Sequence, residues 1–237
     1  MRKQRLLSQS IILALMITTP AWSQSFTASI RGIITDGSGS SIPGAKVIVT
    51  DVRQDTAQST ADEIKARGGK ASAYQLDVTD AAACIALAKQ AAGEVGPVNV
   101  LVNNAGIIIR ETIDSPRAPE NWRRVMDVNV NGIFNVVHAW LPALRQTRGN
   151  IINVASIASF VGVGGNLGYS PSKGAVKLFT QALARDLASD GIRVNAIAPG
   201  VIETPMTAST REASRKRGRS CQCPDQQCRH HYSRDDR

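Results

Sequence analysis

Short apolar runs alternate with helix-like stretches between Lys46 and Gly200, and this alternation constrains the fold more than any other feature of the chain. Strands are predicted at residues 46–50, 71–78, 98–106, 150–156 and 192–200, and helices at 56–69, 80–93, 119–144 and 169–189. Strands that alternate with helices predict an α/β fold, in which helices cover both faces of a parallel sheet. Ligands of such sheets bind at the carboxyl ends of the strands, so functional residues are expected in the turns after them.

The predicted helix at 119–144 carries one apolar stripe that a polar residue interrupts. The stripe recurs at spacings of three and four residues, at Trp122, Met126, Asn129, Ile133, Val137 and Trp140. A buried amide needs a hydrogen-bond partner. Asn129 is therefore either a satisfied amide of the core or a functional residue.

Tyr169 and Lys173 are four residues apart at the start of the predicted helix 169–189, so they share one face of it. A lysine ammonium beside a tyrosine hydroxyl lowers the tyrosine pKa toward the range in which protons are exchanged at neutral pH. Ser156 ends the strand before this helix, where its hydroxyl can bond a substrate oxygen. Taken singly, these residues also fit a surface Tyr–Lys pair and a serine that caps a turn.

Together these residues resemble the short-chain dehydrogenase/reductase family over about residues 44–206. The resemblance is carried by VAS ending at Ser156, YSPSK at Tyr169–Lys173 and DVNVNG around Asn129. LDVTD, NNAG and VNAIAPGVIETPM, in that order along the chain, support it. It implies a Rossmann-like parallel sheet and an oxidoreductase that transfers a hydride between a nicotinamide cofactor and an alcohol or carbonyl substrate.

The resemblance implies a role for each catalytic residue. Tyr169 would be the acid/base that exchanges a proton with the substrate oxygen, and Ser156 would position that oxygen. Lys173 would lower the pKa of Tyr169 and hold the nicotinamide ribose hydroxyls. Asn129 would hold a water in a proton relay with Lys173.

The resemblance also implies cofactor-binding residues in the turns after the strands, and no metal. A carboxylate at Asp51 would accept hydrogen bonds from a ribose 2′-hydroxyl and repel a 2′-phosphate, which favours NAD, while Arg53 leaves NADP open. The implied substrate is a small alcohol or carbonyl compound of unknown identity. The cofactor-binding residues implied are Asp51, Asp77, Val78, Asn104, Ala105, Gly106, Tyr169, Lys173, Pro199, Gly200, Ile202 and Thr204.

The stretch before the first strand lacks the phosphate-binding turn of that family. Its glycines do not follow the spacing T-G-x-x-x-G-x-G, and only ten residues separate Thr35 from Lys46. A parallel crossover usually needs a dozen or more residues, and Gly, Ser and Pro disfavour its helix. A short link between two apolar runs predicts an antiparallel hairpin instead. Residues 25–50 resemble the start of a carboxypeptidase-regulatory-like domain of outer-membrane receptors.

The chain is therefore expected to have four parts. These are a signal peptide-like leader (1–23), a β-hairpin remnant of a different domain (24–44), a partial dinucleotide-binding dehydrogenase domain (45–206) and a disordered basic tail (207–237). The sheet would be incomplete at both ends, with the first βα unit and the C-terminal lid replaced, as in a chimeric sequence. Three hypotheses follow: an oxidoreductase, a catalytically inactive fusion or truncated fragment that lacks the pyrophosphate-binding turn, or an exported β-rich module that binds a partner at a membrane. The leader and the hairpin favour the third, but the rest of the chain does not.

The net charge of +9 belongs mostly to the ends, since residues 1–5 carry +3 and residues 207–237 carry +4. The body lacks the basic surface that nucleic acid would require. Three cysteines and two histidines in the tail could ligate zinc, but their polar surroundings favour a disordered tail. The leader implies export to the periplasm, whereas the family works in the cytoplasm. The resemblance also implies a homodimer through helices 119–144 and 169–189.

Overall fold

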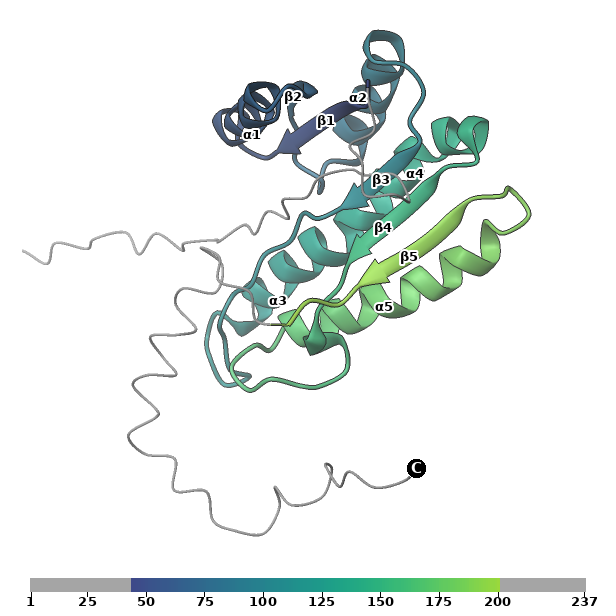
Figure 1. The fold of residues 1–237 in the computed structure, drawn as a ribbon. Coiled ribbons are helices and arrows are strands. Elements are labelled where there is room, and N and C mark those ends of the chain that lie inside the picture. Colours follow the sequence, from purple (N-terminus) through teal and green to yellow (C-terminus); the bar gives the residue numbers. More distant parts are fainter. Residues whose placement is uncertain (1–43, 201–237) are drawn as a thin grey trace, which may run out of the picture.

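The structure, a computed structural model, describes residues 44–200 (Figure 1). In chain order its helices and strands are β1 (Lys46–Asp51), α1 (Gln54–Ala66), β2 (Lys70–Gln75), α2 (Ala81–Glu94), β3 (Val100–Asn103), α3 (Ala118–Met126), the π-helix η1 (Asp127–Asn131), α4 (Gly132–Thr147), β4 (Asn150–Val154), the 3₁₀-helix η2 (Ile157–Ser159), α5 (Tyr169–Asp186) and β5 (Arg193–Ile197).

All strand pairs are parallel, as the alternation of strands and helices predicts, but the strands form two sheets. β1 pairs with β2, and β4 lies between β3 and β5. Within residues 44–200 no hydrogen-bonded ladder joins β1 to β3. The α/β architecture with parallel sheets is confirmed, and the break lies between the first two strands and the last three.

Side-chain alternation along the strands separates a covered face from an open one. Ile151 and Val194 are paired neighbours on the covered face, and both are buried. Val100 and Val102 alternate to the other face and are 47% and 50% exposed. Figure 1 shows α4 and α5 behind β3, β4 and β5, and no described helix in front of them. The expectation of helices on both faces is therefore met for this sheet on one face only, among the described residues.

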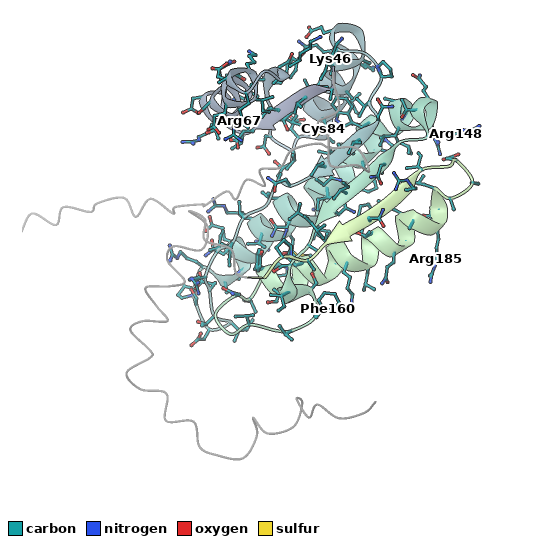
Figure 2. The ribbon with its side chains drawn as sticks, in the orientation of Figure 1. Lys46, Arg67, Cys84, Arg148, Phe160 and Arg185 are labelled. Atoms are coloured by element: carbon teal, nitrogen blue, oxygen red, sulfur yellow. The ribbon has the colours of Figure 1, made fainter. Side chains whose placement is uncertain are left out.

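One apolar core holds the two sheets beside each other. It is formed by α2, α4, α5 and the covered face of β3–β5, and Cys84 of α2, labelled in Figure 2, is fully buried in it. Ile48 of β1 and Tyr74 of β2 pack against the same core. Asn135 Nδ2 of α4 also donates to Val78 O after β2, at 3.0 Å. Among residues 44–200, β1 and β2 are thus linked to the rest of the fold by the α2–α4 contact rather than by strand pairing with β3.

The predicted helix 119–144 is divided by a π-helical turn. α3 ends at Met126, η1 follows, and α4 begins at Gly132. The inserted turn changes which side chains face the core, so that Asn121 and Val125 are buried and Trp122 is 38% exposed. The prediction that Trp122 belongs to the buried stripe is wrong for this reason. π-helical turns are rare and occur frequently at functional sites.

Several sequence-based predictions lie outside the described residues. They concern the leader, the hairpin remnant up to residue 43, the tail with its Cys and His residues, and Ile202 and Thr204. None of the helices in residues 44–200 has the length and hydropathy needed to cross a bilayer.

Candidate active site

The residues that carry the resemblance meet at the carboxyl end of β4. Ser156 follows this strand by two residues, and α5 begins at Tyr169. Gly168, just before α5, lets the helix start approach α3, because a Cβ on this residue would lie 3.1 Å from Val125 Cβ. A larger residue at 168 would push the start of α5 away from the strand ends.

Lys173 is buried with its ammonium group at the carboxyl end of β4. Its side chain is one turn into α5 and is 4% exposed. Nζ donates to Val154 O at 2.7 Å, and no ion pair holds it among residues 44–200. Burial lowers the pKa of Lys173 from 10.5 to about 8. A buried ammonium without a carboxylate partner is costly for stability, which is typical of functional groups.

Tyr169 lies beside Lys173 but not in contact with its ammonium. Lys173 Nζ lies 5.8 Å from the centroid of the tyrosine ring. Burial raises the pKa of Tyr169 above its ordinary 10.0, and the hydrogen bond with Ser156 lowers it by less. The expected lowering of this pKa by Lys173 is not found in the free protein, because the ammonium is directed to Val154 O instead.

Ser156 connects the end of β4 to the active-site helix. Its Oγ accepts a hydrogen bond from Ala158 N at 3.1 Å and so caps the 3₁₀-helix η2. Ser159 closes the same turn and donates from Oγ to Lys173 O at 2.7 Å. The alternative of a turn cap is therefore observed for Ser156, and its bond to a substrate oxygen stays a prediction.

Asn129 sits in the π-helix and is completely buried. Its Oδ1 accepts from Ile107 N at 2.8 Å, and its Nδ2 donates to Ile107 O at 2.9 Å and to Ser172 Oγ at 2.9 Å. Ser172 Oγ in turn donates to Tyr169 O at 2.7 Å. Asn129 is thus a satisfied amide that ties the turn after β3 to the first turn of α5.

Replacing Asn129 with Ala should lower the free energy of unfolding by about 2–4 kcal/mol, because Ile107 N–H and C=O would be buried without partners. Urea denaturation followed by circular dichroism would measure this change. Asn131→Ala is the matched control, since Asn131 is an exposed member of the same π-turn and bonds only Asp127 by its side-chain amide; we expect a loss within about 0.5 kcal/mol. Equal losses in both variants would contradict the tethering role of Asn129.

Gly106 fits the same arrangement from the β3 side. A Cβ on Gly106 would lie 3.3 Å from Asn129 Oδ1 and 3.4 Å from Lys173 Nζ. The glycine therefore keeps the space beside the ammonium clear. This is what a ribose held by Lys173 would require, so these residues fit the nicotinamide half of a dinucleotide.

The other residues predicted to bind the cofactor lie at carboxyl ends of strands. Asp51 ends β1, and its Oδ1 accepts from Arg53 N at 2.9 Å. Asp77 and Val78 follow β2, and Asn104 and Ala105 follow β3. Pro199 follows β5 together with Gly200, and Pro199 O accepts from Ile157 N at 3.0 Å. Three of these residues lie at the carboxyl ends of the β1–β2 sheet, namely Asp51, Asp77 and Val78. The catalytic side chains lie at the carboxyl end of the β3–β4–β5 sheet.

Residues 44–200 contain no glycine-rich turn followed by a helix, which is the structure that would bind the pyrophosphate of a dinucleotide. A phosphate-binding turn would place glycines with the spacing G-x-x-x-G-x-G between a strand and the first turn of a helix. None of the glycines with a positive φ in this range fits that pattern; they are Gly44, Gly68, Gly96, Gly165 and Gly191. The described residues therefore fit the two ends of such a cofactor better than its middle.

Two residues of the site were missed from the sequence. Ser172 joins Asn129 to Tyr169 O, and Ser159 joins the η2 turn to Lys173 O. Ser172 is completely buried, yet small hydroxyl residues are common on helices, and only its position within YSPSK distinguishes it. The whole arrangement can exchange a proton through Tyr169 and present a cation from Lys173.

A family model described as short chain dehydrogenase matches residues 41–215. The 3-oxoacyl-[acyl-carrier-protein] reductase FabG of Thermotoga maritima is 38% identical over 174 residues, which are 73% of this chain and 70% of that protein. A cyclohexanol dehydrogenase of Acinetobacter sp. is 37% identical over 171 residues, 72% of this chain and 68% of that protein.

A solved structure of a gluconate 5-dehydrogenase from Burkholderia cenocepacia, in complex with NADP and tartrate, has a similar fold. Its TM-score is 0.66 at 32% identity, and the match covers 70% of this chain and 65% of that one. The chain thus spans about two thirds of the length of the proteins that it matches.

Proposed function

We propose that this chain, which belongs to the short-chain dehydrogenase family, exchanges a hydride and a proton between a nicotinamide cofactor, NAD or NADP, and a small alcohol or carbonyl compound. The observation that carries the proposal is the convergence of Tyr169, Lys173 and Ser156 at the carboxyl end of β4, with Asn129 buried behind them.

The roles of these side chains follow from their contacts. Tyr169 would give its hydroxyl proton to a carbonyl oxygen during reduction and take it back during oxidation. The Ser156 hydroxyl, already bonded to Tyr169, would hold the same substrate oxygen. Lys173 would turn from Val154 O toward a ribose hydroxyl, and its positive charge would then favour the ionised form of Tyr169.

The bound cofactor would supply or accept the hydride, and the protein would orient it. Lys173 and Gly106 support its nicotinamide side, and Asp51 at the end of β1 supports its adenosine side. Asn129 would act mainly by fixing the turn that carries Gly106. A water relay through Asn129 remains a prediction.

An inactive remnant is the second candidate. It is favoured by the break between β1 and β3 among residues 44–200, because this break lies where the pyrophosphate would cross the sheet edge.

The two candidates differ in an observable way. The first predicts turnover with at least one member of a substrate panel, followed by the absorbance of the reduced nicotinamide. Secondary alcohols and polyols would reduce NAD or NADP, and 3-oxoacyl thioesters would oxidise the reduced cofactor. Loss of the signal in Tyr169→Phe must accompany it; no turnover with any member favours the remnant.

We expect Asp51 to determine the preference between NAD and NADP. Its carboxylate would accept from the 2′-hydroxyl of NAD and repel the 2′-phosphate of NADP. Asp51→Ser should therefore reduce kcat/KM for NAD by about tenfold and raise it for NADP, with Arg53 nearby to pair with the phosphate. Asp55→Ser, also next to Arg53, is the control and should change neither. An unchanged NAD to NADP ratio in Asp51→Ser would remove this role.

A homodimer through α4 and α5 is also part of the proposal. Phe134 of α4 and Leu178 of α5 are 55% and 61% exposed, and the Phe134 ring lies 6.4 Å from the ring of Phe179. Together these side chains form an exposed apolar strip across both helices, as expected of a surface that a partner covers. Sedimentation equilibrium should give a dimer for the full chain and a monomer for Phe134→Glu with Leu178→Glu. A monomer for both chains would contradict it.

A further inference from the structure

Three buried polar side chains are hydrogen-bonded in a row from β3 through β4 to α5, and together they form a buried polar network. Asn103 Nδ2 donates to Asn153 Oδ1 at 2.8 Å, and Asn153 Nδ2 donates to Thr180 Oγ1 at 2.9 Å. Thr180 Oγ1 donates in turn to Val176 O at 2.8 Å. None of the three side chains is more than 6% exposed. The network therefore links two strands to the active-site helix inside the core.

The Thr180 hydroxyl fixes the direction of each bond in this network. A hydroxyl has one proton, and Thr180 gives it to Val176 O, so toward Asn153 it can only accept. The NH₂ group of Asn153 must therefore face Thr180, and its carbonyl oxygen faces Asn103, its partner across the β3–β4 ladder. The network thus has one arrangement, whereas the apolar contacts around it are non-directional.

The network meets the same face of α5 that carries the ammonium. Lys173, Val176 and Thr180 follow one another at spacings of three and four residues, and all three are buried. Lys173 Nζ donates to Val154 O, and Thr180, two turns further along, accepts from the side chain of the adjacent strand residue, Asn153. A rotation or slide of α5 that broke the Asn153–Thr180 bond would therefore also displace Lys173 from Val154 O.

We propose that Asn153 and Thr180 are positioning residues, which set the rotation and axial position of α5 on β4 and so hold the Lys173 ammonium at the carboxyl end of that strand. Hydrogen bonds weaken outside about 2.7–3.2 Å, so this contact tolerates shifts of only a few tenths of an ångström. Ser159 holds the first turn of α5 separately, through Lys173 O. The proposal rests on the proposed function only in its consequence, that Lys173 then meets a cofactor ribose.

A network that merely stabilised the core would have a different effect on Lys173. Removing the Thr180 hydroxyl leaves the buried Asn153 amide without its acceptor, so stability falls in both cases. Loss of a positioning contact also lets the ammonium move toward water, and the pKa of Lys173 then rises from about 8 toward its ordinary 10.5. Loss of a merely stabilising contact leaves this pKa unchanged.

Titration of Lys173 in the full chain without cofactor tests the proposal. The Cε signal of ¹³C-labelled lysine, assigned by its loss in Lys173→Met, gives the midpoint. Thr180→Val keeps the shape without the hydroxyl and should raise the midpoint by at least one pH unit, and Thr180→Ser should restore it. Ile151→Val, a fully buried β4 change outside the network, is the matched control for lost packing and should not move it.

Four results would overturn the positioning role. These are an unchanged midpoint in Thr180→Val, no restoration by Thr180→Ser, an equal rise in Ile151→Val, or a midpoint already near 10.5 in the unmodified chain. Thr180→Ala is the second variant if the valine variant does not fold, because alanine favours helices and also lacks the hydroxyl. It should raise the midpoint in the same way, and an unchanged value would overturn the proposal equally.

Binding of NADH separates this proposal from the proposed function. If the unmodified chain binds NADH, Thr180→Val should weaken the binding at least fivefold, while Ile151→Val changes it by less than twofold. Equal binding by Thr180→Val and the unmodified chain would overturn the positioning of Lys173 toward a ribose. If the unmodified chain binds no NADH, the proposed function fails, and the Lys173 midpoints alone decide whether Asn153 and Thr180 position the lysine.

Discussion

Tyr169→Phe should reduce kcat by a factor of about 10²–10⁴, the usual contribution of a general acid–base group, while NADH binding changes by less than about twofold. The variant removes only the hydroxyl, so the half-buried ring keeps its packing beside Lys173. Steady-state kinetics at a saturating concentration of the best alcohol from the panel would measure the change in kcat. The proton that leaves the alcohol would have no acceptor in the variant.

Tyr74→Phe is the matched control for this experiment. Tyr74 donates its hydroxyl to Glu94 at 2.6 Å on the β2 side of the molecule, outside the catalytic group. It should retain the full kcat. If Tyr169→Phe kept more than a tenth of the activity, the proton would pass through another group and the proposed role of Tyr169 would be wrong.

The pH dependence follows from the state of the same hydroxyl. Burial raises the pKa of Tyr169 in the free protein, so the ionised form that accepts a proton is scarce at neutral pH. The kcat/KM for alcohol oxidation reports the free enzyme and should therefore rise with pH from 6 to 8, the range in which Lys173 keeps its charge. A rate that is independent of pH over this range would show that proton transfer by Tyr169 does not limit oxidation.

Lys173→Met should abolish most of the activity and make the protein more stable. Burial lowers the pKa of Lys173 from 10.5 to about 8, so the folded state opposes the charge by about 3 kcal/mol at pH 7. Methionine has a similar shape without the charge but loses the bond to Val154 O, which leaves an expected gain of about 1–3 kcal/mol. Urea denaturation of both chains at pH 7 would measure it, and a destabilised variant would contradict the account.

The pH dependence of the free energy of unfolding provides a second test of the effect of Lys173 on stability. Between pH 8 and 10.5 the unfolded chain binds more protons than the folded one at this residue, so its contribution to stability improves as pH rises. The advantage of Lys173→Met over the unmodified chain should therefore shrink between pH 7.5 and 9.5, while other titrating groups cancel in the difference. Lys177→Met, one turn further along α5, should show no such trend.

Much of the fold was predictable because each strand and helix has a local signal. KVIVT at 46–50 and NIINVAS at 150–156 are apolar runs bounded by turns, and they became β1 and β4 with shifts of a residue or two. Helical spacing predicts that Tyr169 and Lys173 lie on one face of α5. The order of the strands predicts that Ser156 lies near them.

Other features depend on long-range contacts that no short stretch reveals. Asn129 in the π-turn at 127–131 bonds the backbone of Ile107, 22 residues away. The partner of Lys173 is a backbone carbonyl, which any residue could have supplied. The direction of the Tyr169 pKa shift depends on burial by the whole site and on where the ammonium points, and a pattern of residue types specifies neither.

Binding of NADH to the full chain tests the central claim most directly, because turnover needs a known substrate and binding does not. Energy transfer from tryptophan to the reduced nicotinamide should saturate with a dissociation constant in the micromolar range. Lys173→Met should weaken binding at least tenfold, since this residue is proposed to hold the ribose. A folded chain, with a cooperative urea transition, that gives no saturable signal would contradict the account and leave Tyr169, Lys173 and Ser156 as a remnant of the family's site.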